Sequence, residues 1–427
     1  ASLLNSGIGW HEARVPTIVT SVPRAAFVEA TRQVKDVVSI PVVASNRIND
    51  PDVAEAILVA GQADAVSMAR PLLADPDFVK KTEQGKADEI NTCIACNQAC
   101  LDHTFQLKRA SCLVNPRACH ETALVYLRTA TPKKVAVVGA GPAGLACATV
   151  AAERGHDVTL FDQAGEIGGQ FNMAKVVPGK EEFHQTLRYF QKRIERTGVK
   201  VVLNRRVESE ELEREGFQEI VIATGVSPRR PGIEGIEHAK VVSYVDVLRG
   251  KVQVGERVAI IGAGGIGFDV AEFLAEAPRD GAQPLPEWLA EWGVDFNAQT
   301  RGGLVEKHPE TPARKIYLLQ RKESTPGKDL GKTSGWVHRA TLKHRDVEML
   351  PGCSYDRIDD AGLHITQNDK QGLLEVDQVV ICAGQESLRE LYNESSASHH
   401  LIGGADLAAE LDAKRAIKQG SELAARL

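Results

Sequence analysis

The sequence predicts an α/β fold in which the C-terminal part of a (β/α)8 barrel precedes a cysteine segment and two Rossmann-like nucleotide-binding domains, one inserted in the other. Three observations predict it. A glycine-rich turn between an apolar strand and a helix occurs twice, at 139–144 and 262–267. Five of the eight cysteines fall between Cys93 and Cys119. Ahead of them, within residues 1–90, short apolar strands alternate with helices, which is typical of a parallel sheet.

The bulk properties are those of an ordinary globular protein. At 427 residues the chain is long enough for roughly two to four domains. Hydrophobic residues make up 43% and charged residues 25%, and a net charge of −6 argues against a nucleic-acid or anionic-membrane partner. No apolar run approaches the roughly 20 residues that span a bilayer, and no signal-peptide pattern opens the chain. We therefore expect a cytoplasmic protein.

Residues 1–90 are predicted to be the final units of a barrel whose earlier strands are absent from this chain. A buried strand is expected over 40–45, a helix over 50–60 and another strand over 63–68. These elements are too few for a complete sheet. The segment therefore indicates a barrel remnant, and a partner chain or the missing amino-terminal barrel is expected to be needed.

Two loops of this remnant carry candidate binding residues. Arg47 follows the first strand, and Ala69 and Arg70 follow the second. The loops after the last two strands of a (β/α)8 barrel commonly bind phosphate, and a guanidinium fork matches phosphate oxygens. The two arginines therefore suit the phosphate of FMN, although solvated or structural arginines fit the same spacing. His11 is a candidate catalytic residue, against the commoner structural role of an isolated histidine.

The cysteine run begins at Cys93 and continues through Cys96 and Cys100, with Cys112 returning after a loop. In a large chain without a secretion signal, such clustering indicates metal ligation more than disulfides. Zinc normally uses two matched short pairs, whereas three closely spaced thiolates and a fourth from a loop suit a [4Fe–4S] cluster. The sequence favours the cluster over zinc and leaves Cys119 as the spare thiol.

The first glycine turn follows an apolar strand and precedes a helix of small residues. Gly139 allows the tight turn, Gly141 leaves room for a pyrophosphate, and Gly144 lets the helix pack closely. The pyrophosphate would meet the amides and the positive dipole end of that helix. Asp162 ends the second strand, where a carboxylate can accept a hydrogen bond from a ribose hydroxyl. This pattern predicts a dinucleotide site.

Three later stretches are expected to complete this first site. Gly169 and Gln170 belong to a second flexible turn. The strand over 218–225 ends in Ala-Thr-Gly, where small residues let chain and cofactor approach closely. Asp406 follows a glycine pair just before a helix that opens near Asp412, within reach of a cofactor's ribityl or pyrophosphate region.

The second glycine turn contains Gly262, Gly264 and Gly267. Its second strand is delayed by an insertion and ends in Arg321 and Lys322. No carboxylate stands there to accept from a ribose 2′-hydroxyl, and two cations suit a 2′-phosphate, so NADPH is favoured over NADH. A solvated strand end is the alternative.

The order of these motifs predicts four units, because the stretch over 376–384 resembles the strand that ends in Ala-Thr-Gly. The predicted units are a barrel remnant over 1–90, a cluster segment and linker over 91–125, an FAD-binding domain over 126–250 plus 373–427, and an inserted NADP-binding domain over 251–372.

Taken together, these residues resemble the bacterial-type NADPH-dependent 2,4-dienoyl-CoA reductases, in the flavin and iron–sulfur group that includes trimethylamine dehydrogenase and the old yellow enzyme-like barrels. The most specific marks are GWHEAR at 9–14, the cysteine run with CLVNPRACH at 112–120, and GQE at 384–386. The resemblance covers nearly the whole chain.

The resemblance implies an FMN-binding barrel, a [4Fe–4S] cluster, and an FAD domain with an inserted NADPH domain. It further implies that electrons pass from NADPH through FAD and the cluster to FMN, which reduces an unsaturated acyl-CoA in fatty acid β-oxidation. His11 matches the active-site histidine, and Cys93, Cys96, Cys100 and Cys112 match the cluster ligands. The residues that the resemblance and the motifs assign to cofactors are Arg47, Ala69, Arg70, Gly139, Gly141, Ala143, Gly144, Asp162, Gly169, Gln170, Val207, Ala223, Thr224, Gly225, Gly262, Gly264, Gly267, Arg321, Lys322 and Asp406.

One departure from the family pattern matters for function. The tyrosine that donates a proton beside the histidine belongs to the barrel portion that precedes Ala1. Two alternatives to the reductase therefore stay open: an electron-transfer module that passes electrons from NADPH through FAD and the cluster to a separate acceptor, and an amine dehydrogenase-like relative.

Overall fold

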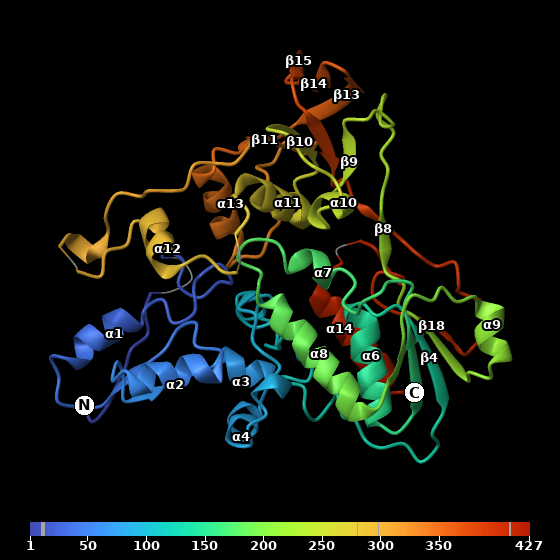
Figure 1. Ribbon diagram of the computed structural model, residues 1–427, viewed down its shortest axis with the longest axis horizontal. Helices are drawn as coiled ribbons and strands as arrows, with labels where there is room; N and C mark the ends of the chain where they lie inside the picture. Colours follow the sequence, from blue (N-terminus) through green and yellow to red (C-terminus); the bar gives the residue numbers. More distant parts are fainter. Residues whose placement is uncertain (10–12, 280, 298, 410) are drawn as a thin grey trace.

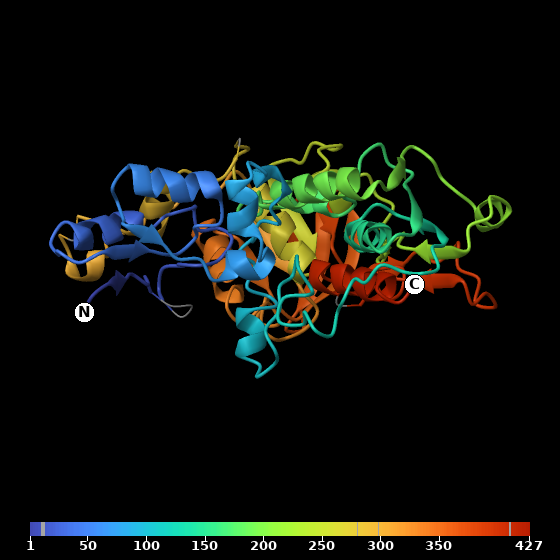
Figure 2. The same cartoon turned by 90° about the horizontal axis from the view of Figure 1, so that it is seen from below.

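The computed structural model describes residues 1–427 apart from 10–12, 280, 298 and 410. The molecule is elongated, with the barrel remnant and the first nucleotide-binding unit at opposite ends and the inserted unit rising between them (Figure 1). Seen from below, the N- and C-termini lie well apart along the long axis (Figure 2). His11 lies outside the described residues.

The barrel remnant contains a three-stranded parallel sheet in the order β1-β2-β3. The predicted strand–helix–strand unit is present, and Asp50 caps its helix α2 by accepting from the backbone N–H of Asp52. The short strand β1 was not predicted, because two residues carry no periodicity. The elements are β1 Leu4–Asn5, α1 Val28–Lys35, β2 Val42–Ala44, α2 Pro51–Val59, β3 Ala65–Val66, α3 Arg70–Ala74 and α4 Phe78–Glu83.

The cysteine segment that follows has little regular structure. Its backbone groups are satisfied by turns and by side chains, as for Asn91, whose backbone N–H donates to Asp75 and whose amide donates to the Val114 carbonyl. Such a segment relies on partners outside itself for its shape. Its elements are η1 Ala87–Glu89 and α5 Leu101–Thr104.

The first nucleotide-binding unit is built on a five-stranded parallel sheet in the order β18-β7-β4-β5-β6. The central strand β4 is apolar and buried on both faces, as parallel strands between helices require. Helices α6, α8 and α14 pack side by side against it (Figures 1 and 2). The elements are β4 Lys134–Val138, α6 Pro142–Glu153, β5 Asp157–Phe161, α7 Phe171–Ala174, α8 Phe183–Thr197, β6 Lys200–Val202, α9 Ser209–Arg214, β7 Glu219–Ile222, β18 His399–Leu401 and α14 Ala413–Ala424.

The inserted unit has its own five-stranded parallel sheet, in the order β12-β11-β10-β16-β9. A three-stranded antiparallel sheet, β13-β14-β15, follows it at the top of Figure 1. The elements are β9 Val241–Ser243, α10 Tyr244–Leu248, β10 Arg257–Ile261, α11 Gly265–Ala275, α12 Leu285–Trp292, η2 Arg301–Gly303, β11 Lys315–Leu319, α13 Gly335–His344, β12 Glu348–Leu350, β13 Cys353–Asp359, β14 Gly362–Gln367, β15 Lys370–Leu374 and β16 Gln378–Ile381.

The limits of the inserted unit differ from the predicted 251–372. Strands β9 and β16 pair in the second sheet, so this unit takes strands from residue 241 to residue 381. The stretch over 376–384 was expected to return to the first sheet because it resembles the strand over 218–225. Both strands are buried and end on small residues beside a glycine turn, and this shared pattern does not say which of the two sheets a strand joins.

A two-stranded antiparallel ribbon, β8 Val226–Pro228 with β17 Gln385–Ser387, joins the two units. Two further contacts fasten the inserted unit in place. Lys180 forms an ion pair of 2.5 Å with Asp269 on α11. The buried carboxylate of Asp102, in the cysteine segment, accepts hydrogen bonds from the backbone N–H (3.0 Å) and the hydroxyl (2.7 Å) of Thr333.

The insertion that delays the second strand packs against the barrel remnant. Phe27 meets the rings of Trp288 and Phe296 edge to face, with centroids 5.9 and 6.2 Å apart. Gln33 donates to the Phe296 carbonyl at 2.8 Å. The insertion therefore serves as a docking element between the two ends of the chain. None of the helices in the described part of the chain is both long and apolar enough to cross a membrane.

Candidate functional site

The first glycine turn has the geometry that the sequence predicts. Gly139 has a φ of 111°, and a β-carbon there would clash with the backbone carbonyl of Ala223. A β-carbon at Gly144 would clash with the carbonyl oxygen of Gly139. At Gly141 the nearest atom to a β-carbon is 4.0 Å away, so this position borders open space at the start of α6. The turn therefore leaves a cradle where a pyrophosphate would meet the helix N-terminus.

Distant parts of the chain converge on this turn. A β-carbon on Gly169 would stand 2.9 Å from the α-carbon of Gly141, so the turn that contains Gly169 and Gln170 lies against the cradle. Thr224 follows Ala223 beside Gly139, and its hydroxyl donates to the Leu388 carbonyl at 2.7 Å. The predicted residues of the first site that meet around this turn are Gly139, Gly141, Ala143, Gly144, Gly169, Gln170, Ala223, Thr224 and Gly225.

Asp162 and Asp406, both predicted to contact the cofactor, make hydrogen bonds within the protein. The Asp162 carboxylate accepts from the backbone N–H groups of Ala140 (2.6 Å) and Ala164 (2.8 Å), so it fastens the glycine turn to the end of β5. Each carboxylate oxygen has a further lone pair, which leaves room for a ribose hydroxyl. Asp406 accepts from Gln419 of α14 at 2.9 Å. Val207 is buried in an apolar cluster with β4 and β7.

The second glycine turn repeats the same construction. Gly262 has a φ of 113°, and a β-carbon there would clash with the carbonyl of Cys382, at the end of β16. A β-carbon on Gly267 would clash with the carbonyl of Gly262, whereas one on Gly264 would meet no atom within 4 Å. The backbone of Cys382 therefore packs against the second glycine turn in the same way that the backbone of Ala223 packs against the first.

Arg321 and Lys322 follow β11, the strand next to β10, and both are exposed. Lys322 pairs with Asp329 at 3.2 Å, with both side chains about three-quarters exposed. Exposed pairs of this kind contribute about 0–1 kcal/mol, so a phosphate can displace the carboxylate at little cost. Both side chains thus lie at the end of the strand next to β10, and their contact with a 2′-phosphate stays a prediction.

The four predicted ligand cysteines line one small cavity. Arg70 and Asn97 line it as well. All four thiols are free: Cys93 is buried and the other three are partly buried, whereas Cys119 is exposed and does not line the cavity. The structure therefore brings together the four thiols singled out by their spacing: Cys93, Cys96, Cys100 and Cys112.

Burial raises the pKa of three of these thiols, Cys96, Cys100 and Cys112, and so disfavours their thiolate forms. Burial, followed by the nearby thiol of Cys93, raises the pKa of Cys112 to about 12. Burial, with the charge of Cys112, raises the pKa of Cys96 well above its ordinary value. Four thiols collected in one buried place repel one another once ionised, and iron or zinc would reverse this because a metal-bound thiol is deprotonated.

The two arginines predicted for a flavin phosphate are held in place by the protein. Arg47 is buried; its Nε donates to the Val22 carbonyl at 2.7 Å, and its Nη2 pairs with Glu182 at 3.0 Å. Arg70 donates through Nη1 to the Ile18 carbonyl at 2.7 Å and to Asn97 at 2.6 Å, and Ala69 precedes it at the start of α3.

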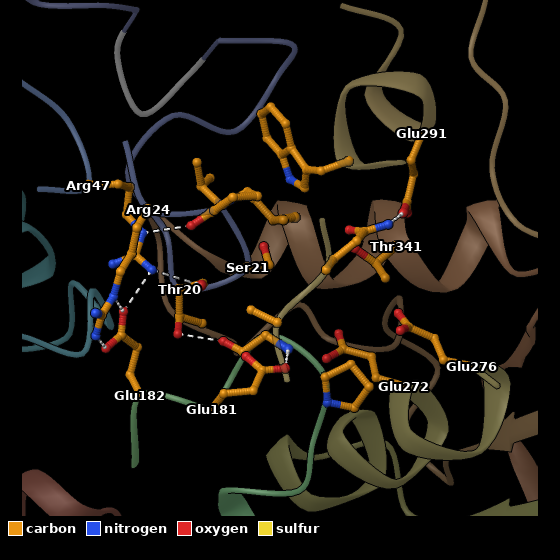
Figure 3. A pocket seen from close by; sticks show the side chains of 18 of the residues that line it. Thr20, Ser21, Arg24, Arg47, Glu181, Glu182, Glu272, Glu276, Glu291 and Thr341 are labelled. Atoms are coloured by element: carbon orange, nitrogen blue, oxygen red, sulfur yellow. Dashed lines mark hydrogen bonds and ion pairs between the residues drawn. The ribbon is translucent and has the colours of Figure 1, made fainter. Parts of the chain in front are cut away.

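A cavity of about 310 Å³ lies between the barrel remnant, the loop before α8 and the inserted unit. Glu182 stands between Arg24 and Arg47 on one side, and Glu272, Glu276 and Glu291 approach from the other (Figure 3). Most of these carboxylates already form hydrogen bonds or ion pairs with other side chains of the protein. Glu272 accepts from His338 at 2.7 Å, Glu291 pairs with Arg345 at 3.1 Å, and burial raises the pKa of Glu276 to about 7.

Sequence reasoning missed Glu182, Asn49 and Asn97, which contact predicted site residues. Glu182 belongs to an ordinary Lys-Glu-Glu run before a helix, a pattern that indicates a solvated helix start. Its partners Asn49, Arg47 and Arg24 lie 133, 135 and 158 residues earlier in the chain, and no local periodicity indicates such a pairing. Asn97 offers a weak signal, because it stands inside the cysteine run.

This combination of two dinucleotide turns on two parallel sheets defines an α/β oxidoreductase of the pyridine-nucleotide class. The pyridine nucleotide-disulphide oxidoreductase family matches residues 133–405, well over half the chain, and the chain belongs to that family. Residues 2–89 match the NADH:flavin oxidoreductase / NADH oxidase family, in agreement with the barrel remnant.

Three similar proteins extend over more of the chain. A metal reductase of Desulforamulus reducens is 37% identical over 388 residues, which is 90% of this chain and 57% of the relative. A cinnamate reductase of Clostridium sporogenes is 28% identical over 84% of this chain and 49% of the relative. The solved complex of 2-naphthoyl-CoA reductase with 2-naphthoyl-CoA superposes with a TM-score of 0.86 at 28% identity and covers 100% of this chain and 60% of that one. The chain thus spans about half to three-fifths of these proteins.

Proposed function

We propose that the chain is part of an oxidoreductase that passes electrons from NADPH through FAD and a [4Fe–4S] cluster to FMN and reduces 2,4-dienoyl-CoA, a step of unsaturated fatty acid β-oxidation. The observation that carries the proposal is the cavity lined by four free cysteines beside Arg70. This cavity distinguishes the chain from an oxidoreductase that has two dinucleotide turns alone. The proposed reaction also requires a barrel, and the described residues supply three of its strands.

The residues fit each proposed group to a different degree. The open cradle at Gly141, with Asp162 behind it, suits the pyrophosphate and ribose of FAD. The open position at Gly264, with Arg321 and Lys322 at the neighbouring strand end, suits NADPH. Arg47 and Arg70 offer the phosphate of FMN a partial site, because the other strands of a barrel site are not among the described residues.

The cysteine cavity suits a cluster better than a single metal ion. Four thiolates on one zinc ion would stand about 3.8 Å apart, given bonds of about 2.3 Å to a tetrahedral centre. Within the described ranges, no three His, Cys, Asp or Glu side chains are gathered closely enough to hold one metal ion. In a [4Fe–4S] cube each thiolate bonds a different iron, so wider spacing around a shared cavity is required.

The similar proteins support the substrate class. A cinnamate reductase and a 2-naphthoyl-CoA reductase both act, by their names, on conjugated carbon systems next to a carboxyl or thioester carbon. A conjugated dienoyl thioester has the same electronic character. The histidine predicted to act in this step, His11, lies outside the described residues and remains a prediction.

An activity assay separates the two main candidate functions. Supplied with the complete barrel, the protein should oxidise NADPH anaerobically only when a dienoyl-CoA is added, with the thioester reduced in equal amount. NADPH-dependent reduction of a dye without any thioester-dependent turnover would instead support an electron-transfer module for a separate acceptor. Oxidation of methylated amines by the same preparation would indicate the amine dehydrogenase-like alternative.

The chain as given is expected to retain FAD and to hold FMN poorly. The glycine turn of the first site is in place between β4 and α6. Arg47 and Arg70, by contrast, supply only the phosphate end of the FMN site. Flavin extraction followed by chromatography should show about one FAD and little FMN per chain. Stoichiometric FMN on the isolated chain would contradict this expectation.

Replacing Arg321 and Lys322 together by alanine should weaken NADPH selectively. Each charge-assisted hydrogen bond to the 2′-phosphate contributes about 1.5–3 kcal/mol, so KM for NADPH should rise at least about tenfold while KM for NADH changes little. Steady-state dye reduction with each nucleotide measures both values. Lys315→Ala, at the opposite end of β11, is the matched control and should leave both unchanged. Equal losses for NADPH and NADH would reject the assignment.

A further inference from the structure

Glu182 precedes α8 in the first nucleotide-binding unit, yet its side chain binds the barrel remnant. Its Oε2 pairs with Arg24 at 2.7 Å and its Oε1 pairs with Arg47 at 3.0 Å, and the carboxylate is 8% exposed. Asp50 completes the group by pairing with Arg24 at 3.0 Å. Two guanidinium groups are thus balanced by two carboxylates, and one of these, Glu182, comes from a distant part of the chain. Figure 3 shows Glu182 beside Arg24 and Arg47.

Asn49 links this ion-pair network to the cysteine segment. The buried side-chain amide nitrogen of Asn49 donates both to Glu182 Oε1 at 2.9 Å and to the backbone carbonyl of Cys93 at 2.7 Å. Arg47 and Asn49 belong to the same loop, so Glu182 fixes that loop at two points. The result is a buried path from Arg47 through Glu182 and Asn49 to Cys93.

The path requires a charged carboxylate. Burial alone would raise the pKa of Glu182, but the hydrogen bond from Arg24 and the charge of Arg47 outweigh it and hold the pKa at about 2. Removing the charge leaves the buried Arg47 without its carboxylate partner and the partly buried Arg24 with Asp50 alone. Removing one partner of a buried ion pair is strongly destabilising because it leaves an uncompensated charge. The neighbouring Glu181 differs, because it accepts from the backbone N–H of Gly179 at 2.9 Å and borders the cavity (Figure 3).

The second phosphate-loop arginine reaches the cysteine segment without a bridge. Arg70 donates directly to Asn97, between Cys96 and Cys100, and lines the cysteine cavity. Both arginines predicted for a flavin phosphate are therefore connected to the cysteine segment, one directly and one through Glu182.

We propose that Glu182 is a positioning residue that holds Arg47 and the Cys93 backbone in a fixed relation, so that the phosphate end of the barrel site and the cysteine cavity share one buried ion network. The inference rests on the proposed function, because it gives that network a role between two redox sites. Glu182 touches neither site itself and acts through Arg47 and Asn49.

The test compares Glu182→Gln and Asn49→Ala with the control Glu181→Gln, each in the full chain purified anaerobically. Hydrogen exchange of the backbone over 90–96 should be at least tenfold faster in the first two variants and unchanged in the control. Iron release to a ferrous chelator should be at least fivefold faster in both, and the electron paramagnetic resonance spectrum of the reduced cluster should change. The double variant should be no worse than either single one, since both act on one path.

The outcomes are distinct. Unchanged exchange over 90–96, or faster exchange with unchanged iron release and spectrum, would overturn the proposal and leave Glu182 a structural ion pair. A control variant that behaves like Glu182→Gln would overturn it as well. Wild-type chain without iron, but with faster exchange in Glu182→Gln, would reject the proposed function while the positioning of the Cys93 segment by Glu182 stands.

Discussion

Replacing Cys96 by serine should abolish iron and sulfide binding. If the four cavity cysteines bind a [4Fe–4S] cluster, the wild-type chain purified anaerobically carries about four irons and four sulfides and is brown beyond its flavin colour. Cys96 is one of four thiols that line a single cavity, and losing one of four ligands would let the cluster dissociate. Residues 90–115 should also become more open to proteolysis, because they contain little regular structure to hold them. Metal analysis, sulfide analysis and limited digestion measure these effects.

Cys119→Ser is the matched control for this experiment. Cys119 is exposed and does not line the cavity, so its replacement should leave the iron content unchanged. Reduction of the bound flavin by NADPH should stay intact in the Cys96 variant, since that hydride step precedes the cluster. One zinc per chain without sulfide would contradict the cluster. Equal iron loss in both variants would show that the fourth ligand was misassigned.

Replacing Gly144 by alanine should prevent the first nucleotide-binding unit from folding around its cofactor. The added methyl group would overlap the carbonyl oxygen of Gly139, which is backbone and cannot rotate away. Ordinary overpacking costs about 1–3 kcal/mol, and a rigid obstacle in the tight turn should cost about 3 kcal/mol or more. Loss of bound FAD together with a lower unfolding temperature is the expected result.

Gly141→Ala separates folding from binding at the same turn. A β-carbon at Gly141 has its nearest neighbour 4.0 Å away, and the backbone there is extended with a φ of −80°, so alanine fits the protein. The unfolding temperature of the apoprotein should match that of wild type, whereas FAD binding should weaken at least tenfold because the methyl group stands in the cradle. Full FAD retention in this variant would show that the pyrophosphate lies elsewhere.

The sequence predicts those parts of the molecule that depend on local chemistry. The glycine turns could be placed because a tight turn and a close helix admit no β-carbon at Gly139, Gly144, Gly262 and Gly267. The cysteine spacing likewise placed four thiols on one cavity. In both cases a requirement on a few neighbouring residues is sufficient to fix the structure.

Features that depend on distant pairing could not be predicted. Strand β16 was assigned to the wrong sheet, because burial and a small-residue ending describe a central strand of either one. Glu182 and Asp102 gave no signal, since an acid at the start of a helix is usually solvated. Their partners, Arg47 and Thr333, lie 135 and 231 residues away in the chain.

The attachment of the inserted unit has a mechanical consequence. The chain enters and leaves this unit along the ribbon β8–β17, so a rigid-body swing would turn on that ribbon as a hinge. Such a swing has to break the Lys180–Asp269 ion pair and release Thr333 from Asp102, two residues after Cys100. A swing of the inserted unit would therefore also separate Thr333 from the cysteine segment. The position of the second glycine turn and the cover over this part of the cysteine segment would consequently change together in such a swing.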